Sequence, residues 1–130
     1  MIEFAWPLST GEWLAFLTGL ATFLIGMALM IIPRSFMHVL GLAPRQGTSN
    51  GVSEVRGPFG GMWAGLGLAS ILLAQPLVYL ALGIAFAFAV LGRIISLVAD
   101  RTINIHCVVA TLFELASAVF PIAYALQLIP

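Results

Sequence analysis

Four long apolar runs follow one another along the chain, separated by short polar stretches. A run of about 20 apolar residues is long enough to cross a bilayer as a helix. The pattern therefore predicts an all-α integral membrane four-helix bundle, formed by one domain over residues 1–130. The transmembrane spans are expected at about 13–32, 57–74, 77–98 and 103–128.

The connections predict how the spans are arranged. Only Gln75 and Pro76 separate spans two and three, so these helices are expected to be antiparallel neighbours. The longer connection opens with PRSFMHVLGLAP, where Phe36, Val39 and Leu40 stand at helical spacing. This spacing favours a short interfacial helix between spans one and two. The following RQGTSNGVSE is rich in turn formers and predicts a surface loop.

Composition agrees with the hydropathy pattern. Apolar residues make up 62% of the chain and charged residues 8%, whereas roughly a quarter of a soluble domain is charged. The net charge is zero, which gives no reason to expect a nucleic-acid partner. The single cysteine, Cys107, cannot form an intramolecular disulfide and is interpreted as an apolar filler. No metal site and no cofactor are expected.

The basic residues predict the orientation in the membrane. The two connections that follow spans one and three carry four arginines, which are Arg34, Arg45, Arg56 and Arg101. The termini and the Gln75-Pro76 turn carry none. Loops rich in Lys and Arg stay in the cytoplasm. Both termini are therefore expected outside the cytoplasm, in a multi-pass protein of the bacterial inner membrane.

Small residues mark one face of the second span. Gly57, Gly61 and Gly65 recur at intervals of four, and such a stripe lets two helices approach closely in lipid. The favoured interpretation is packing inside the monomer, against span one or span three. The alternative is the contact surface of a homodimer.

Four charged residues lie in or beside the spans, where each is costly unless it is paired. Arg93 interrupts span three, Glu114 interrupts span four, and Glu54 and Arg56 precede span two. We expect them to face inward as one network from three helices. In this network Glu114 pairs with Arg93 or Arg56, and Glu54 pairs with the other arginine.

Two further polar residues are candidates for this polar core. Asn104 and His106 enter span four from the cytoplasmic side, and His106 is near the face of Glu114. One interpretation is structural, because buried ion pairs can fix helix register. The other is a pocket for a small polar or amphipathic ligand, or a proton relay through Glu114. No catalytic motif is present, so no catalytic residue is predicted.

The charged and glycine-rich segments resemble a known family. The matching residues are Glu54, Arg56, Gly57, Gly60 and Gly61 in SEVRGPFGG, the pair Gly92-Arg93, and Glu114 in TLFELAS. This set resembles the bacterial domain-of-unknown-function family 4345, small four-span membrane proteins, over about residues 17–118. The architecture is also similar, more loosely, to DoxX-like proteins. The resemblance implies four spans and the charged set, and it implies no reaction.

Three functions are therefore open. The first is a small membrane protein that binds a lipid-like or small polar ligand, in which a cavity should reach Glu114. The second is an accessory or structural subunit that packs into a larger membrane complex, or a homo-oligomer. The third is an enzyme acting on a lipid or quinone, for which the sequence offers no catalytic template.

Overall fold

The computed structural model describes residues 3–130, and all regular structure in this range is helical. The elements are α1 (Thr10–Ile31), α2 (Pro33–Val39), α3 (Asn50–Glu54), the π-helical η1 (Val55–Gly61), α4 (Met62–Leu73), α5 (Pro76–Ala99) and α6 (Ile105–Ala125). Among them, α1, α5 and α6 are each long and apolar enough to cross a membrane. The prediction of an all-α protein with several membrane helices is confirmed.

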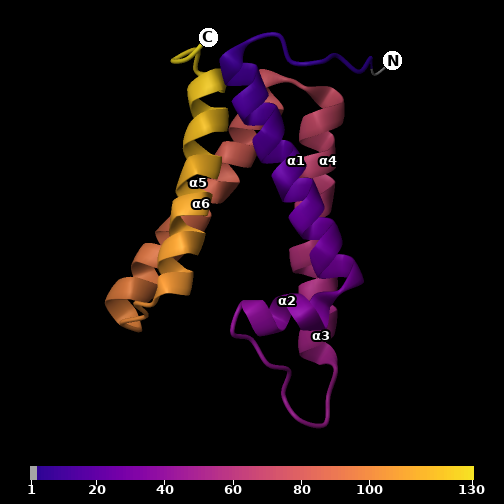
Figure 1. Cartoon of the computed structure of the whole chain (residues 1–130), viewed down its shortest axis with the longest axis vertical. Coiled ribbons are helices and arrows are strands. Elements are labelled where there is room, and N and C mark those ends of the chain that lie inside the picture. The colour runs from indigo at the N-terminus through magenta and orange to yellow at the C-terminus, as the bar shows by residue number, and fades with distance from the viewer. Residues whose placement is uncertain (1–2) are drawn as a thin grey trace.

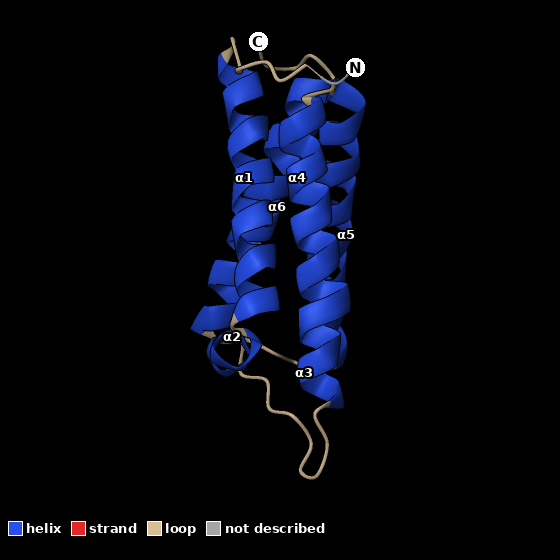
Figure 2. Ribbon diagram, turned by 90° about the vertical axis from the view of Figure 1, so that its right-hand side faces the viewer, coloured by secondary structure: helices blue, strands red, loops and turns tan. Residues whose placement is uncertain are grey.

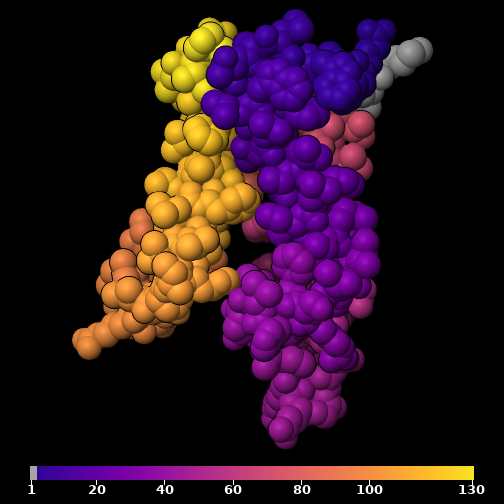
Figure 3. Space-filling view, viewed as in Figure 1, coloured from indigo at the N-terminus to yellow at the C-terminus, as the bar shows by residue number. Residues whose placement is uncertain are grey.

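The long helices form two pairs that meet at one end and diverge at the other (Figure 1). One arm consists of α1 packed along η1 and α4, and the other consists of α5 packed along α6. Figure 3 shows an open cleft between the arms, wide at the end opposite the chain termini. The helices α4 and α5 are joined by a tight turn yet lie in different arms, and side chains as far from the turn as Trp63 and Phe86 still pack against each other. The neighbour relation expected from the short connection therefore holds over this part of the two helices.

The first helix begins and ends where local chemistry dictates. The Ser9 hydroxyl caps its start by accepting a hydrogen bond from the backbone N–H of Glu12 at 3.2 Å. The helix ends at Ile31, and Pro33 opens α2, where its missing N–H costs nothing. The short helix expected after span one is thus confirmed, and its location at the membrane interface stays a prediction.

The second apolar segment starts earlier than its sequence pattern indicated. The chain is already helical at Asn50, so the prediction of a surface loop up to the start of span two is wrong for residues 50–54. Tertiary packing explains the difference. Val52 and Val55 are buried against Leu29 and Met37, and helical geometry places both valines on the same side.

A π-helical stretch interrupts this second segment. Pro58 lies inside η1, and a proline within a helix lacks the N–H and displaces the carbonyl that would normally accept it. A wider turn accommodates this loss without ending the helix. Consequently α3, η1 and α4 follow one another directly and form one helical rod over residues 50–73, which lies beside α1 (Figure 2).

The contact between α1 and this rod is a backbone-to-backbone approach. A Cβ added at Gly67 would lie 2.6 Å from the Gly19 carbonyl oxygen, and one added at Gly60 would lie 2.8 Å from the Met30 nitrogen. Gly26 of α1 is equally close to the Ala64 backbone. No side chain larger than hydrogen fits at these positions without separating the helices.

The glycine stripe predicted to pack inside the monomer faces elsewhere. A Cβ added at Gly57, Gly61 or Gly65 would meet no described atom within 4 Å. The prediction of packing within the chain is therefore wrong for these three residues. A second row of small residues, Gly60, Ala64 and Gly67, lies roughly a quarter turn around the axis of the rod and faces α1. This orientation also turns Trp63 and Leu66 toward the junction of the two arms.

The second arm follows its predicted limits closely. The helix α5 matches span three to within one residue at each end, and α6 lies inside span four. Gly83 brings them together, since a Cβ there would lie 3.0 Å from the Ala118 carbonyl oxygen. Leu82, Phe86 and Ala118 form the buried cluster at the junction of the arms, and Trp63 of α4 packs edge-on against the Phe86 ring.

Candidate functional site

An ion pair joins α5 to α6. Arg93 donates from Nε to Glu114 Oε2 at 3.1 Å and from Nη2 to Oε1 at 3.0 Å, a two-pronged geometry that is among the strongest pairings of charged side chains. The Glu114 side chain is 9% exposed and that of Arg93 is 35% exposed. The pair expected between Arg93 and Glu114 is therefore present.

The depths of the two residues explain why they meet. Glu114 lies nine residues into α6, about 14 Å along its axis, and Arg93 lies six residues before the end of α5, about 9 Å along its axis. The two helices are antiparallel, so both positions are measured from the same end of the arm. The long arginine side chain covers the remaining offset of about 5 Å.

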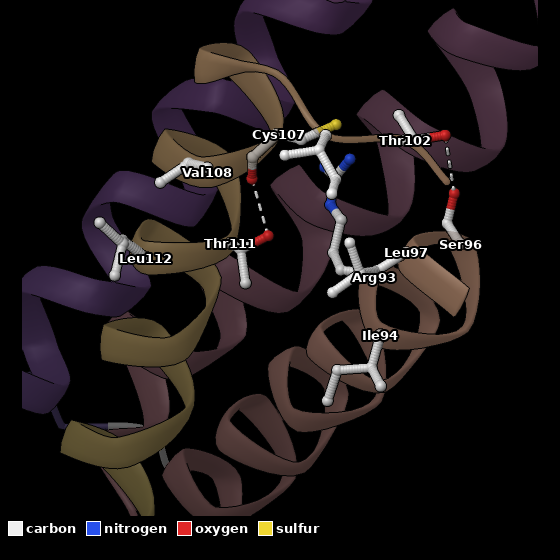
Figure 4. Close-up of a pocket in the computed structure, with 10 residues that line it drawn as sticks. Arg93, Ile94, Ser96, Leu97, Thr102, Cys107, Val108, Thr111 and Leu112 are labelled. Atoms are coloured by element: carbon white, nitrogen blue, oxygen red, sulfur yellow. Dashed lines mark hydrogen bonds between the residues drawn. The ribbon is translucent and has the colours of Figure 1, made fainter. Parts of the chain in front are cut away.

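A cavity of about 280 Å³ adjoins the arginine side of the pair (Figure 4). It lies between the last turns of α5 and the first turns of α6, beside the connection that joins them. Its walls are mainly apolar side chains, with a few polar groups among them: Arg93, Ile94, Ser96, Leu97, Thr102, Ile103, Cys107, Val108, Thr111 and Leu112. Such a combination is typical of sites for amphipathic molecules.

Hydroxyl groups line the cavity end nearest the connection. Ser96 Oγ lies 2.9 Å from Asp100 Oδ2, to which it donates, and 3.5 Å from Thr102 Oγ1. Thr111 Oγ1 donates to the Cys107 carbonyl oxygen at 2.7 Å, so the proton of this hydroxyl is used in a hydrogen bond within α6. The hydroxyl groups of Ser96 and Thr102 thus lie at the cavity end nearest the connection, and most of the other lining side chains are aliphatic.

The guanidinium group of Arg93 extends toward this polar end (Figure 4). The Glu114 carboxylate accepts hydrogen bonds from Arg93 Nε and from one N–H of Arg93 Nη2. Within residues 3–130, the Nη1 donors make no hydrogen bond to an oxygen atom, and the sulfur atom of Cys107 lies beside them. Three N–H groups of a charged side chain are therefore available to a bound molecule.

The structure does not bring Glu54 and Arg56 to this pair. Both belong to the α1 arm, where Arg56 Nη1 donates to the Met30 carbonyl oxygen and Glu54 is exposed. Among residues 3–130, Arg93–Glu114 is the only ion pair. The expectation that charges from three helices meet in one network is therefore wrong, because the arms diverge at the level where Arg56 lies.

Asn104 and His106 do not join the pair either. The Asn104 side chain caps α6 by accepting from the backbone N–H of Cys107 at 2.9 Å. His106 is partly buried and, within the described part of the chain, makes no side-chain hydrogen bond or ion pair. The expected position of both residues at the start of the last helix is correct, and the expectation that they join the polar core around Glu114 is wrong.

Sequence reasoning missed the cavity itself. The expected cavity was to reach Glu114, whereas the residues that line the observed one include Arg93 and exclude its partner. Cys107, interpreted as a filler, lies on the cavity wall. The feature of the sequence that could have indicated this cavity is the recurrence of hydroxyl residues on either side of the helix connection, at Ser96, Thr102 and Thr111. In residues 3–130, no group of three or more His, Cys, Asp or Glu residues is arranged to hold a metal ion.

Comparison with known proteins assigns the chain to a family. Neither the curated proteins nor the solved structures include a match to this sequence. Nothing in these comparisons supports the looser likeness to DoxX-like proteins. One family model matches residues 11–126, which is most of the chain. The protein therefore belongs to the family described as "Domain of unknown function (DUF4345)".

Proposed function

We propose that the chain crosses a bacterial inner membrane four times, with residues 50–73 forming the second span. The rod of α3, η1 and α4 lies along the membrane helix α1, which supports this role. Its outer face exposes Phe59, Met62 and Leu68, side chains that lipid accommodates better than water.

The distribution of charge supports the orientation. The two connections that carry four arginines lie at the open end of the arms, and both termini lie at the other end (Figure 1). The arginine-bearing end is then cytoplasmic and the termini are outside. A cysteine introduced at Gly47, labelled by a membrane-impermeant maleimide only after the cytoplasmic membrane is permeabilised, tests this orientation.

Within this topology, the protein binds an amphipathic molecule in the α5–α6 cavity. The single observation that carries the proposal is the position of Arg93, which is anchored by Glu114 on one edge and borders the apolar cavity with its other edge. Glu114 fixes the orientation of the guanidinium group, and the remaining donors bind the polar end of the ligand. The aliphatic walls accept its apolar part.

The same geometry favours ligand binding over proton relay. Both Glu114 oxygens accept a hydrogen bond from Arg93, so protonation of this carboxylate would give up its charge pairing with the arginine. A relay also needs a chain of donors and acceptors that continues beyond the glutamate. Within the described residues, Glu114 makes hydrogen bonds to Arg93 alone.

Two neighbouring valines provide the experiment. Val108 lines the cavity, whereas Val109 is exposed on another side of α6 and does not. Protein purified in mild detergent is extracted with organic solvent, and the bound small molecules are identified by mass spectrometry. We expect Val108→Trp to lose a molecule that wild type and Val109→Trp retain. Equal content in all three proteins would refute binding in this cavity.

The accessory-subunit hypothesis remains the second candidate because the stripe of Gly57, Gly61 and Gly65 is uncovered. An uncovered small-residue stripe on a membrane helix can accept a helix of another subunit. Native mass spectrometry of complexes released from membranes tests this function. If Gly61→Leu leaves every assembly intact, the stripe is not a subunit contact.

A further inference from the structure

We infer that the α5–α6 cavity binds a phospholipid whose headgroup carries a primary amine, of the phosphoethanolamine type, taken from the leaflet on the side of the helix connection. This inference rests on the proposed ligand-binding function and names the class of its ligand. It is carried by Arg93, Ser96 and Thr102 on the cavity wall and by Asp100, which accepts a hydrogen bond from Ser96 beside it.

The cavity lies at the depth where headgroups meet hydrocarbon. Arg93 is about 9 Å from the end of α5 along the helix axis, and its guanidinium group bonds to Glu114, whose backbone lies about 5 Å deeper. The charge is therefore held just below the interface, where an arginine near a helix end is tolerated. A lipid phosphate that enters the cavity from the interface can reach the guanidinium group, and a soluble ligand is not needed.

The phosphate group is bound by Arg93 and Thr102. Arg93 lines the cavity and its Nη1 donors have no oxygen partner among the described residues, and Thr102 belongs to the same cavity wall. Arginine binds phosphate through paired N–H groups. The edge formed by Nε and Nη2 stays with Glu114, so a phosphate meets the other edge and the ion pair persists.

The carboxylate group of Asp100 is the partner for a primary ammonium group. Its Oδ2 accepts from Ser96 Oγ at 2.9 Å, which places the carboxylate next to a residue of the cavity wall. Its Oδ1 makes no hydrogen bond within residues 3–130. An ammonium with three N–H donors can bond to this oxygen, whereas a choline group has no proton to donate.

The charges around the site distinguish this lipid from an anionic one. Arg93 is balanced by Glu114, and Asp100 is followed directly by Arg101, so the four formal charges cancel. A set of charges with no net excess complements a zwitterion and has no excess attraction for a negative lipid. The headgroup therefore spans from Arg93 to Asp100 with its two charges in the matching order.

The volume indicates which part of the lipid is enclosed. About 280 Å³ corresponds to roughly nine water-sized groups at about 30 Å³ each. This accommodates a headgroup and the first methylene groups, and it is too small for two acyl chains. The remainder of each chain leaves the cavity past Ile94 and Leu112, two residues of its wall that are 50% and 60% exposed.

The inference is tested by native mass spectrometry of the purified, delipidated chain. Phosphatidylethanolamine, phosphatidylcholine and phosphatidylglycerol are added together in equal amounts. Wild type is compared with Val108→Trp, with its control Val109→Trp, and with Asp100→Asn, which keeps an oxygen acceptor for Ser96. Circular dichroism verifies that each variant is folded, and Leu112→Trp replaces Val108→Trp if that variant is not.

We expect wild type to bind phosphatidylethanolamine about fivefold better than the other two lipids, at the upper end of what an exposed ion pair contributes. Val108→Trp should lose the bound lipid and Val109→Trp should keep it. Asp100→Asn should bind phosphatidylethanolamine and phosphatidylcholine equally, with total lipid binding unchanged. Retention of the preference by Asp100→Asn, or a preference of wild type for phosphatidylglycerol, would overturn the inference.

The outcomes separate the inference from the function on which it rests. If Val108→Trp releases a lipid that shows no preference for the amine headgroup, the binding site stands and the ligand class is wrong. If Val108→Trp releases a co-purified molecule other than a lipid, the same conclusion holds. If no variant differs from wild type in any bound molecule, both proposals fail together.

Discussion

The contact between α1 and α4 makes a quantitative prediction about two glycines of one helix. Gly67 faces α1, where an added Cβ would lie 2.6 Å from the Gly19 carbonyl oxygen and 2.7 Å from the Phe23 Cα. Gly65 is two residues away, and an added Cβ there would meet nothing within 4 Å. Substitution of each by alanine adds the same methyl group in opposite environments.

The magnitudes follow from these distances. Ordinary van der Waals contact of a Cβ begins at about 3.4 Å, and the Phe23 nitrogen is nearer still than these two atoms, so Gly67→Ala must separate the two backbones by about 1 Å. A gap of this size forfeits a quarter to a half of the dispersion energy along the contact, and overpacking typically costs about 1–3 kcal/mol. Alanine regains about 1 kcal/mol of helix propensity over glycine. We expect Gly67→Ala to lower the free energy of unfolding by up to about 2 kcal/mol, and Gly65→Ala to leave it unchanged or raise it by up to about 1 kcal/mol.

The assay is unfolding of the purified chain in mild-detergent micelles by added dodecyl sulfate, followed by circular dichroism and tryptophan fluorescence. Trp63 lies on the same helix and packs against Phe86, so fluorescence reports on this part of the fold. The quantity compared is the difference between the two variants, in which the helix-propensity gain cancels, and it is expected at about 1–3 kcal/mol. Equal stability of Gly67→Ala and Gly65→Ala would refute the proposed close approach.

Two further predictions concern helix ends and use the same unfolding assay. Asn104→Ala removes the side-chain acceptor of the Cys107 N–H and should destabilise the chain by about 1 kcal/mol. Asn104→Asp keeps an acceptor and should retain wild-type stability. If the alanine variant is as stable as wild type, the cap contributes nothing. Ala74 has φ 46°, in the left-handed conformation that glycine adopts without strain. Ala74→Gly should therefore stabilise the chain by about 0.5–1 kcal/mol. A loss of stability would contradict this account of the turn.

Part of the site was predictable because a membrane leaves few choices. Arg93 and Glu114 are ionisable residues in apolar helices that follow one another in the chain, and an unpaired charge at either position is costly. A short connection makes α5 and α6 antiparallel, so the two depths alone indicate that the side chains meet. Arg56 and Glu54 were placed in the same network on depth alone, and depth says nothing about which arm a helix joins.

The amino-acid sequence by itself determined the helical class, the limits of α5 and α6 to within a few residues, the turn at Gln75 and Pro76, and the pairing of Arg93 with Glu114. These follow from local periodicity and from the cost of burying charge, which act on neighbouring residues. Only the tertiary structure decided that the helices form two diverging arms and which of two small-residue rows faces α1. It also decided that the cavity lies between α5 and α6, at the Arg93 side of the ion pair. The physical reason is that several faces of these helices are apolar or small, so hydropathy is nearly equal around each axis, and close backbone packing across the whole molecule selects one arrangement.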